Sequence, residues 1–505
     1  MRLSAILEDM PGVEVIRDAE VTGIAYDSRV VSPGYAFFAI PGFKEDGRRY
    51  IQDALRRGAS AVVTSVDGMD GLPLEVNVPE GAGFASTPDP RRALSWAASA
   101  FYGHPSRDLT VVGITGTKGK TTTCHLVKSV LDACGLRTGL IGTVHNIVGD
   151  EVRPVTRTTP ESSDLQSLLR EMVSKGCDAV TMEVSSHALE LFRVEDILFD
   201  GAVFTNMGWD HLDFHGTMDA YAAAKARLFE LLSKSEGRKK NERPLCAAVN
   251  ADDPYAGLFR SKATGTVVTY GLGEDSLVRA KDVRTEAKGT VFTLTFGSTE
   301  RKVRTRLIGR FNVYNSLAAA AVAYGLGFDT DCVAQGLESA RNVRGRVELV
   351  PGSDRFSVWV DYAHTPESIR DILALAREMT ANRVIVVFGC GGDRDATRRP
   401  VMGKLAGDMA DLVIITNDNP RTEDPDKILD HIESGVKESR GSGSYLRIKD
   451  RRAAINEAIS KAMPGDVVVL AGKGHETYQI IGDQTFHFDD VEEARKAIMA
   501  VSGRE

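Results

Sequence analysis

Runs of apolar residues and the polar turns between them divide the chain into three stretches of different character. In the first stretch, short strand-like runs at 36–42 and 59–65 lie among turns. This stretch ends in a helical pattern at 89–106 that closes with a His-Pro turn. The turn predicts a first domain boundary.

From Leu109 the pattern changes to repeated strand–loop–helix units. Residues 109–116 predict a strand that runs into a glycine-rich loop, and residues 122–135 predict a helix that ends at Gly135. The pattern predicts these further elements in the same stretch: apolar strands at 178–186 and 200–207, short antiparallel strands within 266–309, and an alanine-rich helix at 312–327.

The last stretch begins near 341–348 and alternates buried-type strands with helical patterns. The strands are predicted at 356–363, 382–392, 411–418 and 466–474. This alternation predicts a mostly parallel, doubly wound sheet. Loops at the C-terminal ends of its strands are then the expected functional loops.

Composition and charge narrow the class of protein. The chain has 505 residues and a net charge of −8, which argues against nucleic acid or an anionic membrane as the main partner. No apolar run of about 18 residues occurs, and the N-terminus lacks a signal-peptide pattern. The six cysteines form no C-x-x-C motif, so we expect reduced cytosolic thiols rather than disulfides or a zinc site.

The segment GITGTKGKTT (113–122) is the strongest single chemical signal. A glycine-rich turn between a strand and a helix forms an anion cradle from backbone N–H groups. Lys120 can reach the β- and γ-phosphates of a nucleotide, and Thr121 can offer its hydroxyl to Mg²⁺. Ile114 stands where the strict pattern has its first glycine, so a plain glycine-rich turn is the alternative. The predicted ATP-binding residues of this loop are Gly116, Thr117, Lys118, Gly119, Lys120, Thr121 and Thr122.

The loop and three later segments together resemble the Mur ligases. TGTKGKTT is similar to the loop shared by Mur ligases and folylpolyglutamate synthetases. MEVSSHALE (182–190), NMGWDHLDFHG (206–216) and YAAAKARLFELL (221–232) follow in the order found in Mur ligases. Taken singly, their polar residues could be a strand-end carboxylate, a core histidine and a solvated lysine.

The resemblance implies an ATP-dependent amide ligase that works through an acyl phosphate. Lys120, Glu183, His211 and Lys225 are the implied catalytic residues. Thr121 and Glu183 would hold one Mg²⁺, and Glu183, His211 and Lys225 a second. Lys225 would be carbamylated by CO₂ (N6-carboxylysine), which turns a cation into an anion with hard oxygen ligands that suit Mg²⁺.

The resemblance also implies the fold and the rest of the ATP site. We expect three α/β domains: a smaller N-terminal domain at 1–106, a central P-loop-type parallel-sheet domain at 107–341, and a C-terminal Rossmann-like domain at 342–505. Asn312 would contact adenine, Arg346 the phosphates and Asp361 the ribose. Asn312 could instead cap its helix, and Arg346 could form a surface ion pair.

The N-terminal stretch 22–63 resembles the domain that binds the UDP part of the substrate. Ser28 matches a contact to uridine diphosphate, framed by Asp27, Arg29 and the loop 41–51. Phe43 and Lys44 replace a His-Gln pair seen in relatives. The central domain would add contacts, although Arg157 replaces an Asn and Leu191 a Gln; the implied contacts are Thr158, Thr159, Ser185 and Arg193.

The segment DNPR (418–421) resembles the amino-acid recognition motif of the diaminopimelate-adding members. A guanidinium at Arg421 can bind the extra carboxylate that distinguishes meso-diaminopimelate from lysine, and Arg394 would bind the other carboxylate. A site built around such a contact can reject lysine by about 10⁴–10⁵-fold. The implied amino-acid-binding residues are Arg394, Asp418, Asn419, Pro420, Arg421, Gly472 and Glu476.

The sequence therefore predicts a cytoplasmic ligase, expected as a monomer, with small-molecule substrates only: ATP, UDP-N-acetylmuramoyl-L-alanyl-D-glutamate and meso-diaminopimelate. Four alternatives stay open at this point. They are a lysine-adding Mur ligase, a folylpolyglutamate-synthetase-like ligase, a nucleotide-dependent regulator without catalysis, and a P-loop motor acting on nucleic acid.

Overall fold

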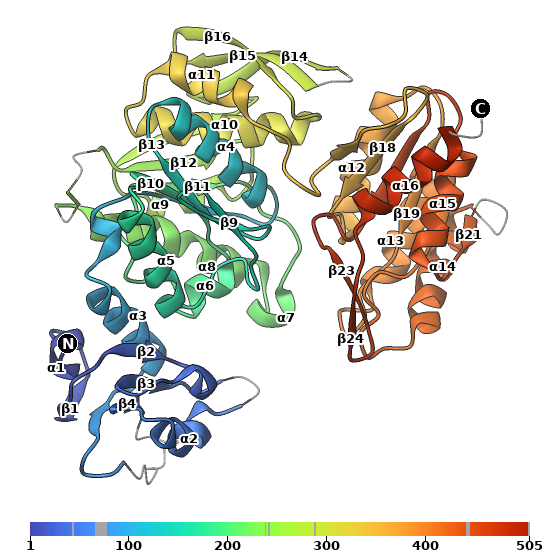
Figure 1. Ribbon diagram of the computed structural model, residues 1–505. Helices are drawn as coiled ribbons and strands as arrows, with labels where there is room; N and C mark the ends of the chain where they lie inside the picture. Colours follow the sequence, from blue (N-terminus) through green and yellow to red (C-terminus); the bar gives the residue numbers. More distant parts are fainter. Residues whose placement is uncertain are drawn as a thin grey trace. The chain divides into compact units, whose positions relative to one another are not determined.

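The computed structural model of the protein describes residues 1–42, 45–65, 78–237, 239–240, 243–286, 289–440 and 445–502. Its contacts divide the chain into two compact units. Unit 1 comprises Met1–Val283, Phe292–Val303 and Phe311–Ala340, and unit 2 comprises Arg284–Val291, Arg304–Arg310 and Arg341–Glu505. Helices and strands alternate through both units (Figure 1). The α/β class predicted from the sequence is confirmed.

The N-terminal part of unit 1 is built on a five-stranded sheet in the order β1-β5-β4-β3-β2. Strands β2 to β5 are parallel, and β1 pairs antiparallel with β5. The predicted strands at 36–42 and 59–65 are confirmed as β3 and β4. The bounds are α1 (Leu3–Ile6), β1 (Glu14–Arg17), β2 (Gly23–Ala25), β3 (Tyr35–Ala39), α2 (Ile51–Arg56), β4 (Ala61–Thr64), β5 (Gly83–Ser86) and α3 (Pro90–Phe101).

Helix α3 shows how local sequence fixes its own ends. Asp89 caps its start by accepting hydrogen bonds from the backbone N–H groups of Arg91 and Arg92, both at 3.1 Å. The helix ends before the predicted limit at 106, because Gly103 and His104 adopt positive φ angles of 67° and 52°.

The central sheet has eleven strands in the order β16-β15-β14-β13-β12-β11-β6-β10-β7-β8-β9. The strands from β7 through β6 to β14 pair in parallel wherever pairing is described. Their bounds are β6 (Thr110–Thr115), β7 (Thr138–Ile141), β8 (Asn146–Val148), β9 (Glu151–Arg153), β10 (Ala179–Glu183), β11 (Gly201–Phe204), β12 (Cys246–Asn250), β13 (Thr266–Gly271), β14 (Val278–Glu286), β15 (Gly289–Phe296) and β16 (Thr299–Thr305).

One strand prediction in this sheet is wrong for β13. The stretch 266–309 was expected to hold antiparallel strands, but β13 runs parallel to β12 along its length and parallel to β14 at Tyr270 and Val278. A short apolar run shows that a segment is a buried strand, but it does not show the direction of its neighbours. The direction of β13 is known only from its pairing with β12 and β14.

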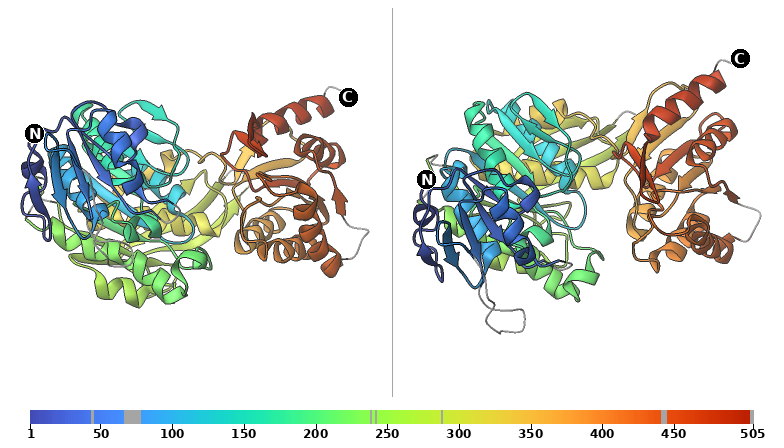
Figure 2. Two further views of the ribbon diagram at one scale, coloured as in Figure 1. Left: turned by 90° about the horizontal axis from the view of Figure 1, so that it is seen from below. Right: turned by 60° about the horizontal axis from the view of Figure 1, so that its bottom comes forward.

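Helices cover both faces of the central sheet (Figures 1 and 2). Apolar residues of α5 and α8 pack into the core that contains β10 and β11. On the other face, a Cβ at Gly201 would lie 2.7 Å from Val322 of α10. The helices are α4 (Lys120–Ala133), α5 (Ser162–Ser174), α6 (Ser186–Glu190), α7 (Leu212–His215), α8 (Met218–Leu231), α9 (Ala256–Lys262), α10 (Arg310–Gly325) and α11 (Thr330–Ser339).

Unit 2 contains a six-stranded sheet in the order β17-β18-β22-β19-β20-β21, parallel except for β17. Successive residues of β19 enter two different cores, one shared with α12 to α14 and one with α15 and α16. The doubly wound prediction is confirmed. The bounds are β17 (Glu348–Val350), β18 (Ser357–Asp361), α12 (Pro366–Met379), β19 (Val384–Phe388), α13 (Arg398–Met409), β20 (Leu412–Ile415), α14 (Pro425–Arg440), β21 (Tyr445–Arg447), α15 (Arg451–Lys461), β22 (Val467–Ala471), β23 (Tyr478–Ile481), β24 (Gln484–His487) and α16 (Asp490–Ser502).

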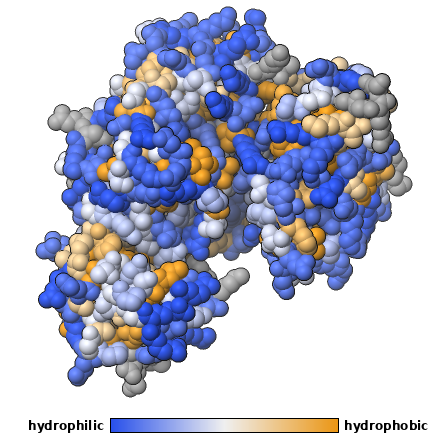
Figure 3. All heavy atoms as spheres, viewed as in Figure 1, coloured by the Kyte–Doolittle hydropathy of each residue, from blue (hydrophilic) through white to orange (hydrophobic). Residues whose placement is uncertain are grey.

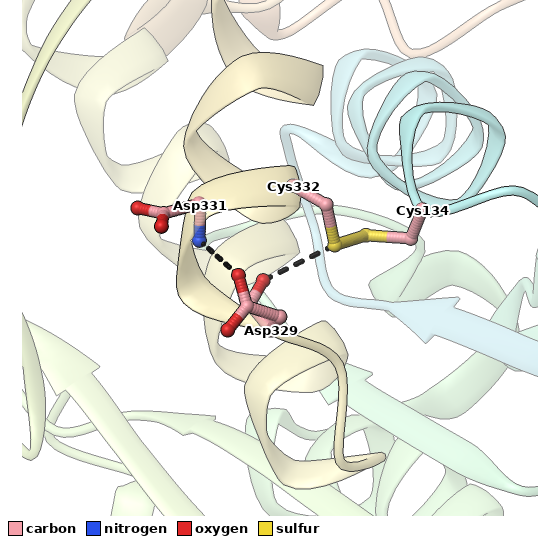
Figure 4. Close-up of a disulfide and its surroundings, with 4 residues drawn as sticks. All are labelled: Cys134, Asp329, Asp331 and Cys332. Carbon is pink, nitrogen blue, oxygen red and sulfur yellow. Dashed lines mark hydrogen bonds between the residues drawn. A yellow bond between two sulfur atoms is a disulfide. The ribbon is translucent and has the colours of Figure 1, made fainter.

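Two cysteines form a disulfide, contrary to the expectation that all six thiols are reduced. Cys134, just after α4, is bonded to Cys332 of α11, and their Cα atoms lie 5.1 Å apart (Figure 4). The two residues are 198 positions apart in the sequence, so local spacing could not reveal the pair. The remaining cysteines are free thiols: Cys124, Cys177, Cys246 and Cys390.

Candidate active site

The phosphate loop follows β6, which lies between β11 and β10 in the central sheet. Gly116 has a φ of 143°, and a Cβ there would lie 1.9 Å from Thr205 Oγ1. Gly119 has a φ of 84°, and a Cβ there would lie 2.4 Å from Asn315 Oδ1. Backbone conformation and space both require glycine at these two positions.

Residues at the end of β11 hold the loop in place. The backbone N–H of Thr117 donates to the main-chain oxygen of Asn206 at 2.8 Å. The Asn206 amide also bonds both main-chain groups of Lys118, accepting from its N–H at 3.0 Å and donating to its oxygen at 3.1 Å. Helix α4 then begins at Lys120, with Thr121 and Thr122 buried in its first turn. A positive helix terminus beside a glycine-rich turn favours bound anions.

Two predicted catalytic lysines meet at the main-chain oxygen of Gly116. Lys120 donates to it at 2.9 Å and to the oxygen of Thr117 at 3.0 Å. Lys225, from α8, donates to it at 2.8 Å and lies 4.3 Å from the centre of the Tyr221 ring. Burial, and then the nearby Lys120 ammonium, hold the pKa of Lys225 well below its usual range. A lysine in this setting is readily neutral.

Glu183 ends β10 next to the start of α4. Strand pairing puts it opposite Ile114 of β6, and it is 1% exposed. Thr121 donates its hydroxyl to Glu183 Oε2 at 3.0 Å, and the backbone N–H of Thr143 donates to Oε1 at 2.7 Å. The structure therefore brings together the predicted hydroxyl and carboxylate ligands of one metal ion.

His211 lies at the start of α7 with a positive φ of 53°. Burial lowers its pKa to about 4, and the nearby Lys120 and Lys225 act in the same direction. Its ring centre lies 4.9 Å from that of His187. Among the described residues, no three or more His, Cys, Asp or Glu side chains form a group that could hold a metal ion. The predicted metal ligands therefore include, besides Glu183 and His211, the hydroxyl of Thr121 and a modified Lys225.

The predicted muramoyl-peptide contacts gather around the end of β10. Thr159 donates to the main-chain oxygen of Glu183 at 2.8 Å, and Ser185 caps α6 beside it. Arg193 donates to the main-chain oxygen of Thr159 at 3.2 Å. Thr158 accepts a hydrogen bond from the Thr143 hydroxyl at 3.1 Å, which ties it to the Glu183 region.

Glu161 joins Arg157 to this cluster. Its Oε1 lies 2.6 Å from a guanidinium nitrogen of Arg157 and 2.6 Å from one of Arg193. Arg157, where the resemblance to Mur ligases leads us to expect an Asn, therefore brings a positive charge beside a predicted substrate-binding arginine. Leu191, where the resemblance leads us to expect a Gln, lies directly after α6.

Ser28 is buried in the N-terminal part of unit 1. It lies in a 3-10 helix at Ser28–Val30, which Asp27 caps, and it donates a hydrogen bond to Asp53 that helps to lower the pKa of that carboxyl. Tyr26 donates to Asp164 of α5 at 2.8 Å, which links this part to the central sheet domain. Phe43 and Lys44 lie outside the described residues.

The predicted nucleotide residues outside the loop lie in both units. Asn312 is the third residue of α10 rather than its cap, and its Oδ1 accepts from Asn315 at 3.0 Å. In unit 2, Asp361 accepts from the backbone N–H of Val347 at 2.8 Å, and Arg346 lies over the Tyr362 ring at 4.9 Å. Each of these side chains contacts a residue of its own unit.

The DNPR segment follows β20, next to the loop after β22. Asn419 donates to Glu476 Oε2 at 2.8 Å, and Gln479 of β23 donates to the main-chain oxygen of Asp418 at 2.8 Å. Gly472 has a φ of 112°, and a Cβ there would lie 2.5 Å from Asp418 Oδ2. Burial, and then the neighbouring Asp418, raise the pKa of Glu476 above its usual range.

The two arginines predicted to bind carboxylates lie beside one glycine. A Cβ at Gly391 would lie 2.9 Å from a guanidinium nitrogen of Arg421 and 3.7 Å from the Arg394 side chain. Arg421 donates to the main-chain oxygen of Gly392 at 2.7 Å and has a positive φ of 52°. Pro420 is buried, and a Cβ at Gly392 would lie 1.8 Å from its main-chain oxygen. The structure thus unites the predicted amino-acid-binding residues in one region.

Sequence reasoning missed several residues that hold these groups. Asn206 fixes the phosphate loop, and Lys473 is a fully buried lysine among the amino-acid-binding residues. Both lie inside motifs that the sequence displays, NMGWDH and AGKGHETY. Each is a polar residue shortly after a buried strand, and this position could have indicated a functional role. The buried Arg399 forms an ion pair with the partly exposed Glu423, and Arg451 forms a fully buried ion pair with Asp490; no local pattern indicates those partners.

On the face drawn in Figure 3, hydrophilic residues predominate and hydrophobic ones are scattered among them. Over the described part of the chain, no helix is both long and apolar enough to cross a membrane.

Comparison with known proteins identifies relatives along nearly the whole chain. The family models for the Mur ligase family catalytic domain, the Mur ligase middle domain and the Mur ligase glutamate ligase domain match residues 20–102, 114–323 and 345–474. A UDP-N-acetylmuramoyl-L-alanyl-D-glutamate--2,6-diaminopimelate ligase from Geobacillus thermodenitrificans is 44% identical over 500 residues, 99% of each chain. A protein of the same name from Solibacter usitatus is 44% identical over 98% of this chain and 97% of its own.

Solved structures agree with the sequence matches. A structure of a UDP-N-acetylmuramoyl-L-alanyl-D-glutamate--2,6-diaminopimelate ligase is 34% identical, covers 95% of both chains and superposes with a TM-score of 0.67. MurF ligase from Thermotoga maritima in complex with ADP, at 18% identity and a TM-score of 0.63, covers 95% of this chain and 98% of its own and shares the fold. On the evidence of its motifs, its fold and these full-length matches, the chain belongs to the Mur ligase family.

Proposed function

We propose that this protein uses ATP to join meso-diaminopimelate to UDP-N-acetylmuramoyl-L-alanyl-D-glutamate in peptidoglycan synthesis. One observation carries the proposal: a chain with a glycine-rich phosphate loop also has Arg421 of DNPR in the same region as the partly buried Glu476. The first feature supports ATP-dependent chemistry, and the second supports the choice of amino acid. The whole-length relatives bear the corresponding name.

The reaction needs activation because a carboxylate is a poor electrophile. The glutamyl carboxylate attacks the γ-phosphorus of ATP, and ADP leaves. An amino group of diaminopimelate then attacks the acyl carbon, the tetrahedral intermediate expels phosphate, and the amine loses a proton. The loop's backbone N–H groups and Lys120 stabilise charge on the transferred group, and positioning supplies much of the rest.

The residues around the loop fit two Mg²⁺ ions. Thr121 and Glu183 would hold one, and Glu183, His211 and carbamylated Lys225 the other; bound there, the ions would neutralise charge on the transferred phosphoryl group. The low pKa of Lys225 supports carbamylation, because only the neutral amine reacts with CO₂. NMR with isotope-labelled CO₂ tests this: a signal in the native enzyme that is absent from Lys225→Ala supports the modification, and its absence from both contradicts it.

The remaining predicted contacts divide between the two substrates. Ser28, Thr158, Thr159, Ser185 and Arg193 would hold the UDP-muramoyl peptide, and Glu161 supports this role by fixing the Arg193 guanidinium at 2.6 Å. For ATP, Asn312 would contact the adenine, Arg346 the phosphates and Asp361 the ribose.

In the amino-acid site, both carboxylates of diaminopimelate and its distal ammonium have a predicted partner. Arg421 and Arg394 would each bind one carboxylate, and Glu476 would accept from the distal ammonium. Asn419 and the Gly472 backbone would orient the ligand. Lysine would leave Arg421 without its carboxylate, which supports discrimination against it.

We place the enzyme in the cytoplasm as a monomer whose partners are small molecules. The net charge of −8 supports the absence of nucleic-acid and anionic-membrane partners. Sedimentation of the purified protein tests the monomer: the mass of one chain supports it, and that of two contradicts it.

Phosphate release from ATP tests the proposed function. We expect release that requires both the UDP-muramoyl dipeptide and meso-diaminopimelate, with little release when lysine replaces diaminopimelate. Efficient use of lysine would keep the ligase assignment and overturn the role of DNPR. Release with a folate substrate, or none with any substrate, would point instead to the folate-type or regulatory alternative.

A further inference from the structure

Lys473 is a buried cation at the centre of the proposed amino-acid site. It follows β22 in the segment AGKGHETY and is completely buried. Its ammonium nitrogen lies 3.1 Å from Asn419 Oδ1, 3.4 Å from Glu476 Oε2 and 3.9 Å from Asp418 Oδ1. All three partners belong to the predicted diaminopimelate-binding set.

A buried ammonium ion needs compensation, and its partners in turn need the ammonium. Desolvation of an unpaired charge costs several kcal/mol by order of magnitude, so buried charges are normally paired. Here two carboxylates, Asp418 and Glu476, lie in one buried region, and they repel each other. Lys473 supplies a positive charge that favours the ionised form of Glu476.

Lys473 also fixes which way the Asn419 amide faces. Asn419 Oδ1 accepts from Lys473 at 3.1 Å and from the backbone N–H of Ile480 at 3.0 Å. Its nitrogen therefore faces Glu476 Oε2, to which it donates at 2.8 Å. An ammonium ion can only donate, so it selects the oxygen of the amide and excludes the flipped orientation.

We propose that Lys473 is the positioning residue of the amino-acid site: it gives Glu476 its counter-charge and fixes Asn419, so that Glu476 presents an ionised oxygen to the amino group of the incoming amino acid. Lys473 itself does not touch the substrate. The inference rests on the proposed function and deepens it, because it names what sets the charge of that site.

Other charged and titratable groups also act on Glu476, and none of them replaces Lys473. Besides Lys473, the groups among the described residues that interact electrostatically with Glu476 include Asp418, Tyr362, Tyr478 and Arg451. Arg451 is the only other cation among these groups, and it is paired with Asp490 at 2.6 Å. Removing Lys473 therefore leaves Glu476 and Asp418 without their nearest cation.

Steady-state kinetics of Lys473→Met test the proposal. We expect the KM for diaminopimelate to rise about 10- to 100-fold, the range seen when residues that orient ligating groups in metal sites are removed. The KM values for ATP and the UDP-muramoyl dipeptide should stay unchanged. An unchanged KM for diaminopimelate, or an equal rise for all three substrates, would overturn the proposal.

The pH profile separates a charge effect from a merely structural one. Binding of the amino group requires ionised Glu476, so the KM for diaminopimelate should rise as pH falls through the pKa of Glu476. Without Lys473 that pKa rises further, and the acid limb should move to higher pH. Glu476→Gln should lack this limb, and adding Lys473→Met to it should cause little further change. A limb that stays in place in Lys473→Met contradicts the proposal.

Two further variants keep the test decisive. Lys239 is another buried lysine, paired with Asp200 at 2.8 Å in unit 1, so Lys239→Met should lower stability and leave the KM for diaminopimelate unchanged. If Lys473→Met does not fold, Lys473→Arg carries the test: it keeps the charge, so the acid limb should stay at its wild-type pH while the KM rises. If the wild-type enzyme does not use diaminopimelate, the proposed function is overturned. If the wild type uses it but the acid limb does not move in Lys473→Met, only this inference is overturned.

Discussion

The phosphate loop of unit 1 and the amino-acid site of unit 2 both follow parallel strands, but different parts of the chain hold them. The loop is fixed by backbone: glycines at positive φ, and main-chain bonds to Asn206. The amino-acid site is fixed by buried side-chain charges, with Lys473 among its acidic neighbours. The comparison suggests that the shared chemistry depends on backbone geometry, whereas the choice of substrate depends on charges that single substitutions can alter.

The largest effect is expected in the loop itself. Gly116→Ala places a Cβ where Thr205 Oγ1 lies 1.9 Å away, so the loop cannot keep its shape. We expect ATP-dependent activity to fall by about 10³-fold, as when a preorganised donor set is lost. Gly135→Ala is the matched control: it has a φ of 88° but no neighbouring atom within 4 Å. That variant should lose only about 1 kcal/mol of stability. Equal activity of both variants would contradict the backbone account.

In the amino-acid region, we expect the largest loss of stability when one residue of a buried ion pair is replaced. Arg451 and Asp490 are both fully buried, and Arg451 also donates to the main-chain oxygen of Ala471 at 3.0 Å, next to Gly472. Arg451→Met should lower the free energy of unfolding by about 3–5 kcal/mol, because it leaves an unpaired buried carboxylate. Arg370→Met removes an exposed ion pair and should cost at most about 1 kcal/mol. Similar denaturation midpoints for both variants would refute this.

The disulfide ties the C-terminal end of α4, the helix that begins at the phosphate loop, to α11 of the same unit. Among the described cysteines, none forms a disulfide in unit 2. Cys332→Ser should cost about 2–4 kcal/mol under oxidising conditions, because it releases a long loop in the unfolded chain. With a strong reductant present, the variant and the native protein should unfold alike. Cys390→Ser, which removes a free thiol, should not show this dependence on reductant. A loss that persists in reductant would show that packing, not the bond, is responsible.

A smaller and more selective effect is expected at DNPR. Arg421→Lys keeps a positive charge but loses the two-pronged contact to a carboxylate. We expect kcat/KM for diaminopimelate to fall about 10- to 100-fold, consistent with a lost charged hydrogen bond of about 1.5–3 kcal/mol. The KM for ATP should not change. A parallel loss of ATP affinity would break the separation between the two regions.

The sequence was informative where chemistry is local. The phosphate loop, the strand that ends at Glu183 and the DNPR loop were each predicted from contiguous residues, and the structure brings the expected neighbours together. The strands of unit 2 were predicted because residues buried on both faces form long apolar runs. Asp89 likewise marks the start of α3, and Gly135 marks the end of α4.

Features that depend on distant residues could not be predicted. Cys134 and Cys332 meet only because α4 and α11 pack together, and β13 shows its direction only through its partners. The pairing of Lys473 with Asn419 joins two loops of the second unit that are 54 residues apart. Each of these contacts is set by tertiary packing, which a single sequence does not display.

A competition experiment tests most directly whether unit 2 selects the amino acid. The enzyme is given ATP, the UDP-muramoyl dipeptide and an equal mixture of meso-diaminopimelate and L-lysine. The UDP-muramoyl tripeptide products are then identified and quantified by mass spectrometry. The account predicts the diaminopimelate product almost alone. Comparable amounts of the lysine product would contradict it.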